Sequence, residues 1–319
     1  MNQQISKIFK KTFSDTVQLS GHKSEIYTGK FSKDGELYAT AGNDKEINIW
    51  ETFHPQLRNL TSFPNAHSNS ILEICWGKDN SFLYSCSADK SVKIWDIFES
   101  KLVKKYKNHD NFIYSLDVFS DNLICSVGEN SKLVLNDPRA KNPIHEEKFK
   151  FQLLTSKFNH KGDEIYLGGI DNQIKKFNIK TNTIDKDYSL IGHTDTITGI
   201  SISNNDNYLL SNSMDNTLCI WDLRPFVKGG NRLVKVLKGH VHSFERNLLR
   251  CAWSHDDNLV SCGSADRCVH IWDVDTGELL YNLYGHNGSV NEVDFNSANG
   301  EIIGSVSSDH TAIIGKYNI

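Results

Sequence analysis

The sequence repeats one pattern in which an aspartate stands six residues before a tryptophan. The four clear pairs are Asp44 and Trp50, Asp89 and Trp95, Asp215 and Trp221, and Asp266 and Trp272. A histidine, usually after a glycine, stands 22 residues before the aspartate at His22, His67 and His193. Self-similarity at a fixed spacing means that one small structural unit is used repeatedly, so the repeat constrains the fold more than any other feature.

Three weaker copies complete the series. There are seven copies in all, and successive tryptophan positions are 41 to 51 residues apart. The residues at these positions are Trp50, Trp95, Asn136, Phe177, Trp221, Trp272 and Gly315. This period, with the dipeptides Gly-His and Trp-Asp, is typical of WD40-repeat β-propellers, and the chain is identified as a member of that family. Each unit contains short apolar or alternating runs bounded by turn residues, such as "ITGISIS" and "TLCIWD". The predicted fold is therefore all-β, a seven-bladed propeller with four strands per blade.

The last copy supplies only three strands before the chain stops at Ile319. The missing strand is available near the start, in Asp15–Leu19, and we expect it to pair with the C-terminal blade. Such pairing removes the exposed edges of an open array. The expected organisation is an N-terminal tail, 1–14, followed by a single domain, 15–319.

Composition excludes several classes of protein. The formal net charge of −4 gives no global attraction to nucleic acid or to an anionic membrane, and no apolar run approaches the 18 residues of a membrane span. The seven cysteines are scattered and form no C-x-x-C pair, which indicates a reducing compartment and argues against a zinc or thioredoxin-like site. His240 and His242 are interpreted as surface histidines rather than a metal pair. No cofactor and no metal site is expected.

Serine, histidine and aspartate recur together in the repeat, which raises the alternative of a Ser–His–Asp hydrolase. A hydrolase needs one exposed serine on a strained turn, whereas here the serine lies within a predicted strand and the constellation occurs three times. We interpret the sets as structural hydrogen-bond tetrads in which every buried polar group finds a partner. Their members are His22, Thr40, Asp44, Trp50; His67, Ser85, Asp89, Trp95; and His193, Ser211, Asp215, Trp221.

Function is then expected at positions that the repeat does not dictate. In the sixth copy His240 precedes Asp266 by 26 residues, so four residues are inserted near "HVHSFERNLLRCAW". The predicted partner-binding residues are the positions before each repeat aspartate, together with the inserted loop and the segment "LRPF". They are Asn43, Ala88, Glu129, Ile170, Met214, Ala265, Ser308, Arg224, Phe226, Phe244 and Arg246. The alternatives are that the insertion is merely tolerated, that "LRPF" is a packed corner, and that the lysine-rich third and fourth copies have drifted.

The segments "SNSMDNTLCIWDLRPF" and "HSFERNLLRCAWS" resemble the family of 40 kDa WD-repeat proteins of the U5 small nuclear ribonucleoprotein. The resemblance extends through all seven copies and is weakest in residues 1–20 and 100–165. It implies a nuclear, non-enzymatic scaffold that acts in pre-mRNA splicing. It also implies docking on large U5 proteins, notably the Prp8-like core factor, with RNA contacted only indirectly and the free protein monomeric. The alternative is a WD40 peptide reader or adaptor, such as a histone-tail reader or a ubiquitin-ligase substrate receptor.

Overall fold

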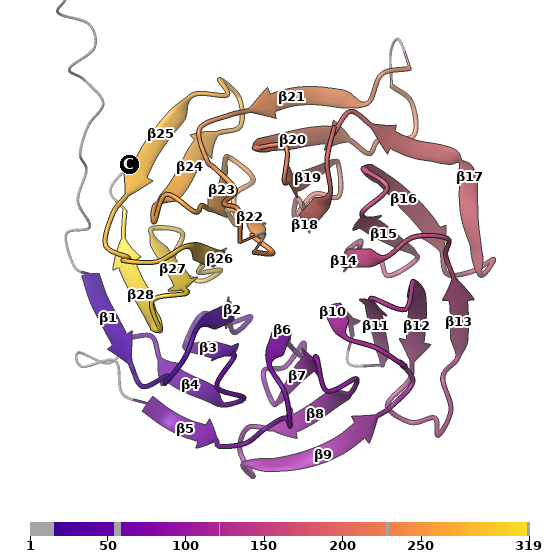
Figure 1. The fold of residues 1–319 in the computed structure, drawn as a ribbon. Coiled ribbons are helices and arrows are strands. Elements are labelled where there is room, and N and C mark those ends of the chain that lie inside the picture. The colour runs from indigo at the N-terminus through magenta and orange to yellow at the C-terminus, as the bar shows by residue number, and fades with distance from the viewer. Residues whose placement is uncertain (1–15, 54–58, 121, 228–229, 246, 318–319) are drawn as a thin grey trace, which may run out of the picture.

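The computed structural model describes residues 16–53, 59–120, 122–227, 230–245 and 247–317. In this part of the chain, 28 strands form seven four-stranded antiparallel sheets arranged as blades around a central channel (Figure 1). The predictions of an all-β class and of a seven-bladed propeller are confirmed. The predicted tail, 1–14, lies outside the described residues. No helix with the length and apolar character needed to span a membrane occurs in the described ranges.

The blades are numbered here in chain order, and their strands are given from the channel outward. Blade 1 consists of β2 (Ile26–Phe31), β3 (Leu37–Gly42), β4 (Ile47–Glu51) and β5 (Asn59–Phe63). Blade 2 consists of β6 (Ile71–Trp76), β7 (Phe82–Ser87), β8 (Val92–Asp96) and β9 (Lys101–Tyr106). Blade 3 consists of β10 (Ile113–Phe119), β11 (Leu123–Gly128), β12 (Lys132–Asn136) and β13 (His145–Lys148). Blade 4 consists of β14 (Leu153–Phe158), β15 (Glu164–Gly169), β16 (Gln173–Asn178) and β17 (Thr183–Ile191).

The remaining three blades follow the same order. Blade 5 consists of β18 (Ile197–Ile202), β19 (Tyr208–Ser213), β20 (Thr217–Asp222) and β21 (Leu233–Leu237). Blade 6 consists of β22 (Cys251–Trp253), β23 (Leu259–Gly263), β24 (Val269–Asp273) and β25 (Leu279–Leu283). Blade 7 consists of β26 (Val290–Phe295), β27 (Ile302–Ser307), β28 (Thr311–Lys316) and β1 (Thr16–Ser20).

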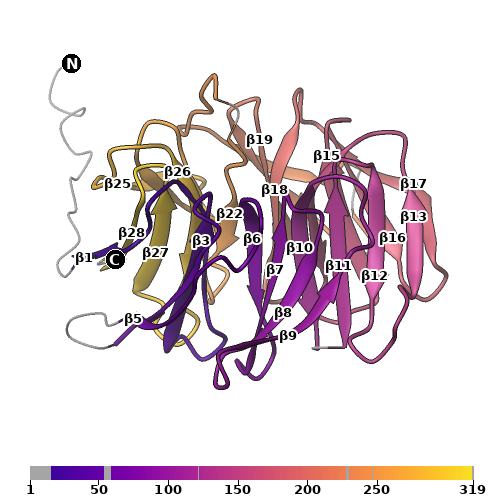
Figure 2. The same ribbon diagram turned by 60° about the horizontal axis from the view of Figure 1, so that its bottom comes forward.

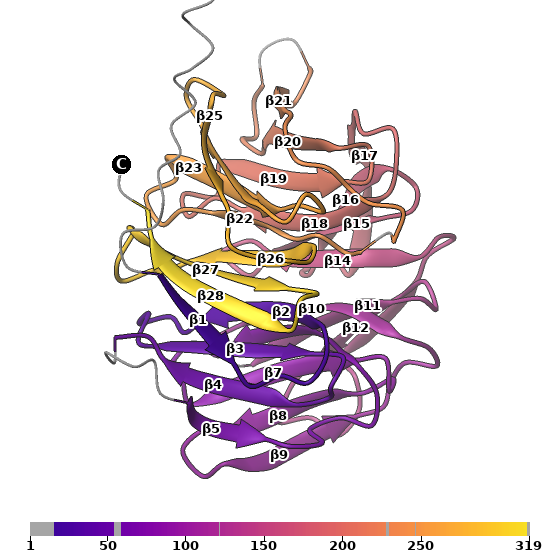
Figure 3. The same ribbon diagram turned by 60° about the vertical axis from the view of Figure 1, so that its left-hand side comes forward.

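The order of blade 7 shows how the ring closes. Strand β1 pairs antiparallel with β28, from Thr16 opposite Gly315 to Ser20 opposite Thr311 (Figure 3). Leu19 is 4% exposed and packs in a cluster with Trp50 of blade 1 and Ile314 of β28. The predicted closure by an N-terminal strand is therefore confirmed, with β1 at Thr16–Ser20; Asp15 lies outside the described residues.

The repeat aspartate has a local role in blades 1, 2, 5, 6 and 7. The residue that follows it has a positive φ, for example 69° at Lys90 and 62° at Asn216, which is costly for a residue with a side chain. The aspartate compensates by accepting a hydrogen bond from the N–H two residues further on: Asp89 from Ser91 at 3.0 Å and Asp215 from Thr217 at 2.9 Å. This side-chain bond stabilises the tight turn between the second and third strands.

Strand direction defines two faces of the ring, since successive strands of a blade are antiparallel. The aspartate turns and the loops with the repeat histidines lie on one face, which we call the upper face. The connections between the first and second strands, and between the third and fourth, lie on the opposite, lower face. Figure 2 shows the strands of each blade running between these two faces. The apolar core consists of clusters between neighbouring blades, such as Trp221 of blade 5 packed with Tyr166 and Ile174 of blade 4.

Candidate functional site: the mouth of the central channel

The repeated serine, histidine, aspartate and tryptophan of blade 5 form a closed network. The Trp221 indole N–H donates to Ser211 Oγ at 2.8 Å, and Ser211 Oγ lies 2.7 Å from His193 Nε2. His193 Nδ1 lies 3.0 Å from the Asp215 carboxylate, which also accepts from the backbone N–H of Thr194 at 2.9 Å. Ser211 is 0% exposed. Burial by itself would raise the pKa of Asp215, but the hydrogen bonds from His193 and its neighbours hold it well below its usual value.

The same network recurs in blades 1 and 2. In blade 1 the His22 imidazole lies 2.7 Å from Asp44 and 2.8 Å from Thr40, and the Trp50 indole donates to Thr40 at 2.9 Å. In blade 2 the equivalent distances for His67, Ser85, Asp89 and Trp95 are 3.0, 2.8 and 2.8 Å. In these three networks each ring nitrogen and each hydroxyl is committed to a partner within its own blade.

The degenerate copies keep parts of the network. Blade 7 keeps the contacts of His286 with Asp309 and Ser305, at 3.1 and 2.9 Å, without a tryptophan. Blade 3 keeps His109 near Ser126 at 2.9 Å, and Asn136 in the tryptophan position accepts from Asn108.

Blade 6 departs from the repeat, and here the interpretation of His240 as a surface histidine is wrong. His240 is 2% exposed, and its Nε2–H donates to Asn212 of blade 5 at 2.8 Å. Cys262 stands four residues before Asp266, at the position of the tetrad hydroxyl, and His270 contacts Asp266 instead at 2.8 Å. The tetrad contact between the histidine and the aspartate is lost in this blade because of the insertion after His240. The insertion lengthens the segment between His240 and Asp266 from the usual 22 residues to 26. Burial, followed by the neighbouring histidines, lowers the pKa of His240 to about 3.

The predicted partner-binding residues do not share one surface. Arg224 and Phe226 follow β20, the third strand of blade 5, so they lie on the lower face. Phe226 is 96% exposed, while Arg224 binds the carboxylate of Asp222 at the end of the same strand. The positions before the repeat aspartates and the fully exposed Phe244 lie on the upper face. The sequence analysis treated the residues of "LRPF" and those before the repeat aspartates as one group. The direction of the strands places them on opposite faces. Arg246 lies outside the described residues.

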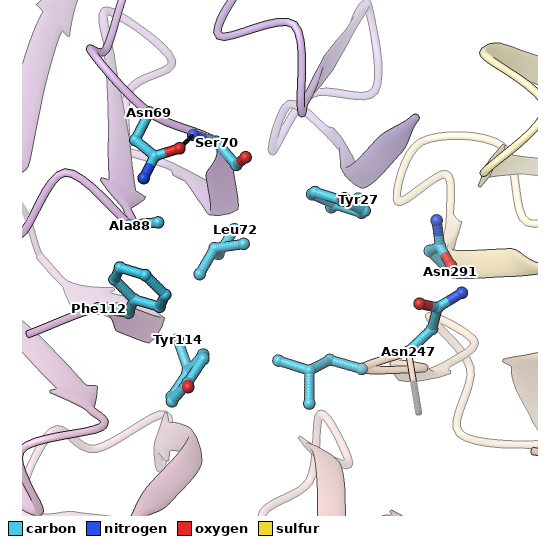
Figure 4. A pocket seen from close by; sticks show the side chains of 10 residues that line it. Tyr27, Asn69, Ser70, Leu72, Ala88, Phe112, Tyr114, Asn247 and Asn291 are labelled. Atoms are coloured by element: carbon cyan, nitrogen blue, oxygen red, sulfur yellow. Dashed lines mark hydrogen bonds between the residues drawn. The ribbon is translucent and has the colours of Figure 1, made fainter. Parts of the chain in front are cut away.

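The upper face is hollowed where the channel opens, by a pocket of about 390 Å³ that we call the mouth pocket. Its walls are largely aromatic or aliphatic, and asparagine amides lie around them (Figure 4). The lining residues are Tyr27, Asn69, Ser70, Leu72, Ala88, Phe112, Tyr114, Asn247, Leu248 and Asn291. No carboxylate and no cationic side chain is among these described lining residues.

Four of the predicted positions belong to this pocket or support it. Ala88 lines it directly. Asn43 Oδ1 accepts from the Ser70 hydroxyl at 2.6 Å, and Ser308 Oγ accepts from the Asn291 amide at 3.0 Å. The charge of Glu129 adds to the burial that raises the pKa of Tyr114.

The other three positions lie in blades 4, 5 and 6 and do not line the pocket. Ile170 is 47% exposed, and Met214 and Ala265 are half-buried.

Sequence reasoning missed most of the pocket, although a signal was present. Tyr27, Leu72, Tyr114 and Asn291 each stand five residues after the repeat histidine of their blade. In each of these blades the innermost strand has a β-bulge at that residue, where its register with the second strand shifts. A bulge redirects a side chain, which here helps to place these residues around the mouth.

Charged side chains fill the channel below the mouth. Arg250 donates to the carbonyl oxygens of Thr198 and Tyr114 at 2.7 Å each and to that of Leu154 at 3.1 Å. Lys30 of blade 1 lies 2.8 Å from Glu292 of blade 7. Burial lowers the pKa of Lys30, but the carboxylates of Asp294 and Glu292 outweigh it and raise the pKa above its usual value. These contacts link the innermost strands around the ring.

Comparison with known proteins gives consistent results. The family model described as "WD domain, G-beta repeat" matches residues 13–51, 57–96, 185–222, 231–273 and 277–314. The segments left unmatched include most of blades 3 and 4, where the tryptophan is replaced.

Several relatives match nearly the whole chain. The chain is 40% identical over 300 residues to the U5 small nuclear ribonucleoprotein 40 kDa protein of Homo sapiens, which covers 93% of this chain and 82% of the relative. It is 39% identical over 302 residues to the protein of the same name from Dictyostelium discoideum, covering 94% and 84%. It is 34% identical over 304 residues to the pre-mRNA-splicing factor cwf17 of Schizosaccharomyces pombe, covering 95% and 87%.

Proposed function

The chain belongs to the WD40-repeat family and, within it, to the family of the U5 small nuclear ribonucleoprotein 40 kDa proteins, and we propose that it is a non-enzymatic interaction scaffold of that particle. In this proposal it acts in the nucleus, in pre-mRNA splicing. The names of its relatives carry this part of the proposal, since they are a component of the U5 particle and a splicing factor.

The mechanism that we propose is rigid presentation of a protein-binding surface. The tetrads and the ionic contacts in the channel hold the innermost strands, and those strands carry the walls of the mouth pocket. The observation that favours this face as the docking surface is the pocket itself: a preformed hollow of about 390 Å³ with apolar walls and amides around it. Aromatic residues around such a hollow are typical anchors for a protein partner.

The lining also bears on the alternative function as a histone-tail reader. A reader of cationic side chains needs carboxylates or a cage that attracts positive charge. The described residues of the mouth pocket supply aromatic walls without a carboxylate, so a lysine or arginine side chain would find no ionic partner among them. Within the U5 particle the proposed partner is a large protein such as the Prp8-like core factor, and RNA is contacted indirectly.

The proposal that the protein is not a hydrolase rests on the burial of the only serine, histidine and aspartate sets that the sequence suggested. A nucleophilic serine must reach its substrate, whereas Ser85 and Ser211 are 0% exposed and already hydrogen-bonded to histidine and tryptophan. We therefore expect no serine to be labelled by a fluorophosphonate probe.

Affinity purification of the tagged full chain from nuclear extract tests the main proposal. Recovery of U5 proteins together with U5 RNA, both above an untagged control, is the expected result. Ribonuclease treatment should remove the RNA and leave the large protein partner bound, because the contact is with protein. Recovery of chromatin or ubiquitin-ligase subunits in place of U5 proteins would overturn the proposal.

A further inference from the structure

Of the three polar partners of a tetrad tryptophan, blade 4 keeps only the aspartate, Asp171. Phe149 stands 22 residues before Asp171, in the histidine position; Leu167 stands in the hydroxyl position and Phe177 in the tryptophan position. All three side chains are buried in one apolar cluster with residues of blade 3. Asp171 pairs instead with Lys175 on β16. The site is therefore rebuilt with apolar contacts and a lysine.

This replacement leaves space at the edge of the blade. In blade 5 the Trp221 ring fills the gap between the loop glycine and the outermost strand: a Cβ on Gly192 would lie 2.9 Å from Trp221 Cη2 and 3.5 Å from Leu233. In blade 4 the glycine position is Lys148 and the position of Leu233 is Ile184, which pairs with Phe177. A phenylalanine ring is shorter than an indole. Lys148 and Ile184 both line a second pocket, of about 410 Å³, which we call the blade-four pocket.

The blade-four pocket combines apolar walls with positive charge. Its other lining residues are Phe149, Lys150, Phe151, Gln173, Lys175, Asp185, Tyr188 and Ser189. Lys175 is engaged, since it pairs with Asp171 and lies 3.5 Å above the Phe151 ring. Asp185 lies 3.3 Å from Lys176. Lys148 and Lys150 are exposed, and neither has an ion-pair partner among the described residues.

We propose that the blade-four pocket binds an extended segment of a partner protein in which an aromatic or other apolar side chain stands beside an acidic one. The apolar side chain enters the space left by the missing indole ring, and the acidic group meets Lys148 and Lys150. Burial of apolar area supplies most of the affinity, and the charges orient the segment. The pocket is separate from the mouth pocket, so the inference goes beyond the proposed splicing role and does not depend on it.

Protein is favoured over single-stranded RNA as the occupant by the charges around the pocket. Glu146 and Glu147 lie on the adjoining β13, and Asp185 is part of the lining. A phosphodiester chain carries a charge at every nucleotide and would pass these carboxylates, whereas a single acidic side chain avoids them. The net charge of −4 acts in the same direction.

The test compares three variants of the full chain in a selection from a random nonapeptide display library. K148E/K150E reverses the two unpaired charges, and K107E/K161E reverses two exposed lysines elsewhere as the matched control. K148G/F177W introduces the glycine and tryptophan pair of blade 5, so that the longer indole ring fills the pocket. Thermal melting first establishes that all three variants fold like the unaltered chain.

Selected peptides are then measured by fluorescence polarisation beside a labelled oligouridylate. We expect peptides that pair an acidic with an aromatic residue, an affinity loss of about tenfold or more in K148E/K150E and in K148G/F177W, and no loss in K107E/K161E. The proposal is overturned if every selected peptide binds K148G/F177W as tightly as the unaltered chain, or if oligouridylate binds this pocket more tightly than the peptides.

Discussion

The guanidinium of Arg250, from the loop that enters blade 6, lies 3.8 Å from the carboxylate of Glu73, on the innermost strand of blade 2. The two blades are on opposite sides of the channel, and both side chains are nearly fully buried, at 4% and 2% exposed. Glu73 also accepts from the backbone N–H of Leu116 in blade 3 at 3.0 Å. One arginine therefore contacts blades 2, 3, 4 and 5 from a single position.

Replacing this arginine should destabilise the whole ring. We expect Arg250→Leu to lower the free energy of unfolding by about 3–5 kcal/mol, because it removes a buried cation beside the buried carboxylate of Glu73 and leaves three carbonyl oxygens without their donor. Urea unfolding followed by tryptophan fluorescence measures the change. Arg139→Leu is the matched control, since it breaks an exposed contact with Asp137 and should barely move the midpoint. Equal midpoints for the two variants would contradict the structural role of Arg250.

The tetrad interpretation makes a prediction about stability rather than activity. His193→Ala or Asp215→Ala should each lower the free energy of unfolding by about 1–3 kcal/mol, because buried partners such as Ser211 lose their hydrogen bonds. Thermal and urea unfolding measure the loss, and co-purification with U5 proteins at a temperature where the variant is folded should persist. Loss of an enzymatic activity at an unchanged melting temperature would instead support catalysis by this set.

The buried histidine of blade 6 predicts how stability depends on pH. Because His240 remains neutral in the folded protein until its pKa of about 3, the unfolded chain takes up its proton first, near the ordinary value of about 6.5. Stability must then fall as the pH drops from about 6.5 toward 3. Between pH 7 and pH 5, the unaltered chain should lose about 2 kcal/mol more than His240→Gln, whose amide can still donate to Asn212. Urea unfolding at both pH values checks this, and parallel losses would contradict it.

Closure of the ring predicts a large effect of a short deletion. Removing residues 1–20 deletes β1, leaves the edge of β28 unpaired and exposes the cluster around Leu19. We expect a broader unfolding transition with a markedly lower midpoint in calorimetry. A chain lacking only 1–14, the predicted tail, is the control and should melt like the full chain. A melting curve that is unchanged by the longer deletion would show that β1 does not close the ring.

The repeat made the architecture predictable. The spacing along the sequence from His22 to Asp44 and on to Trp50 is fixed because these side chains contact one another inside one blade. The prediction that His240 lies at the surface was wrong for a related reason. An insertion of four residues changes the spacing between His240 and Asp266, so this histidine could not be assigned to a buried position from the repeat. The mouth pocket was harder to predict. Tyr27 and Asn291 share a position in the repeat but no chemistry, and a backbone bulge, which no residue type announces, places them there.

The separation of Arg224 and Phe226 from the upper face follows from counting strands. "LRPF" comes after the third strand of its blade, and three antiparallel strands end on the face opposite the repeat histidine. The sequence contained this information, but only once each strand had been assigned. Residues that the repeat does not dictate can therefore be assigned to a common surface only after the direction of each strand is known.

Two phenylalanines on opposite faces test which face docks the partner. Phe112 lines the mouth pocket and is 40% exposed, while Phe226 is 96% exposed on the lower face. We expect Phe112→Ser to reduce recovery of U5 proteins from nuclear extract several-fold, because truncating an aromatic anchor typically costs an interface more than 1 kcal/mol. Phe226→Ser makes the same chemical change away from the pocket and should leave recovery unchanged. If Phe226→Ser alone reduces recovery while both variants melt like the unaltered chain, the lower face carries the partner and the proposed docking surface is wrong.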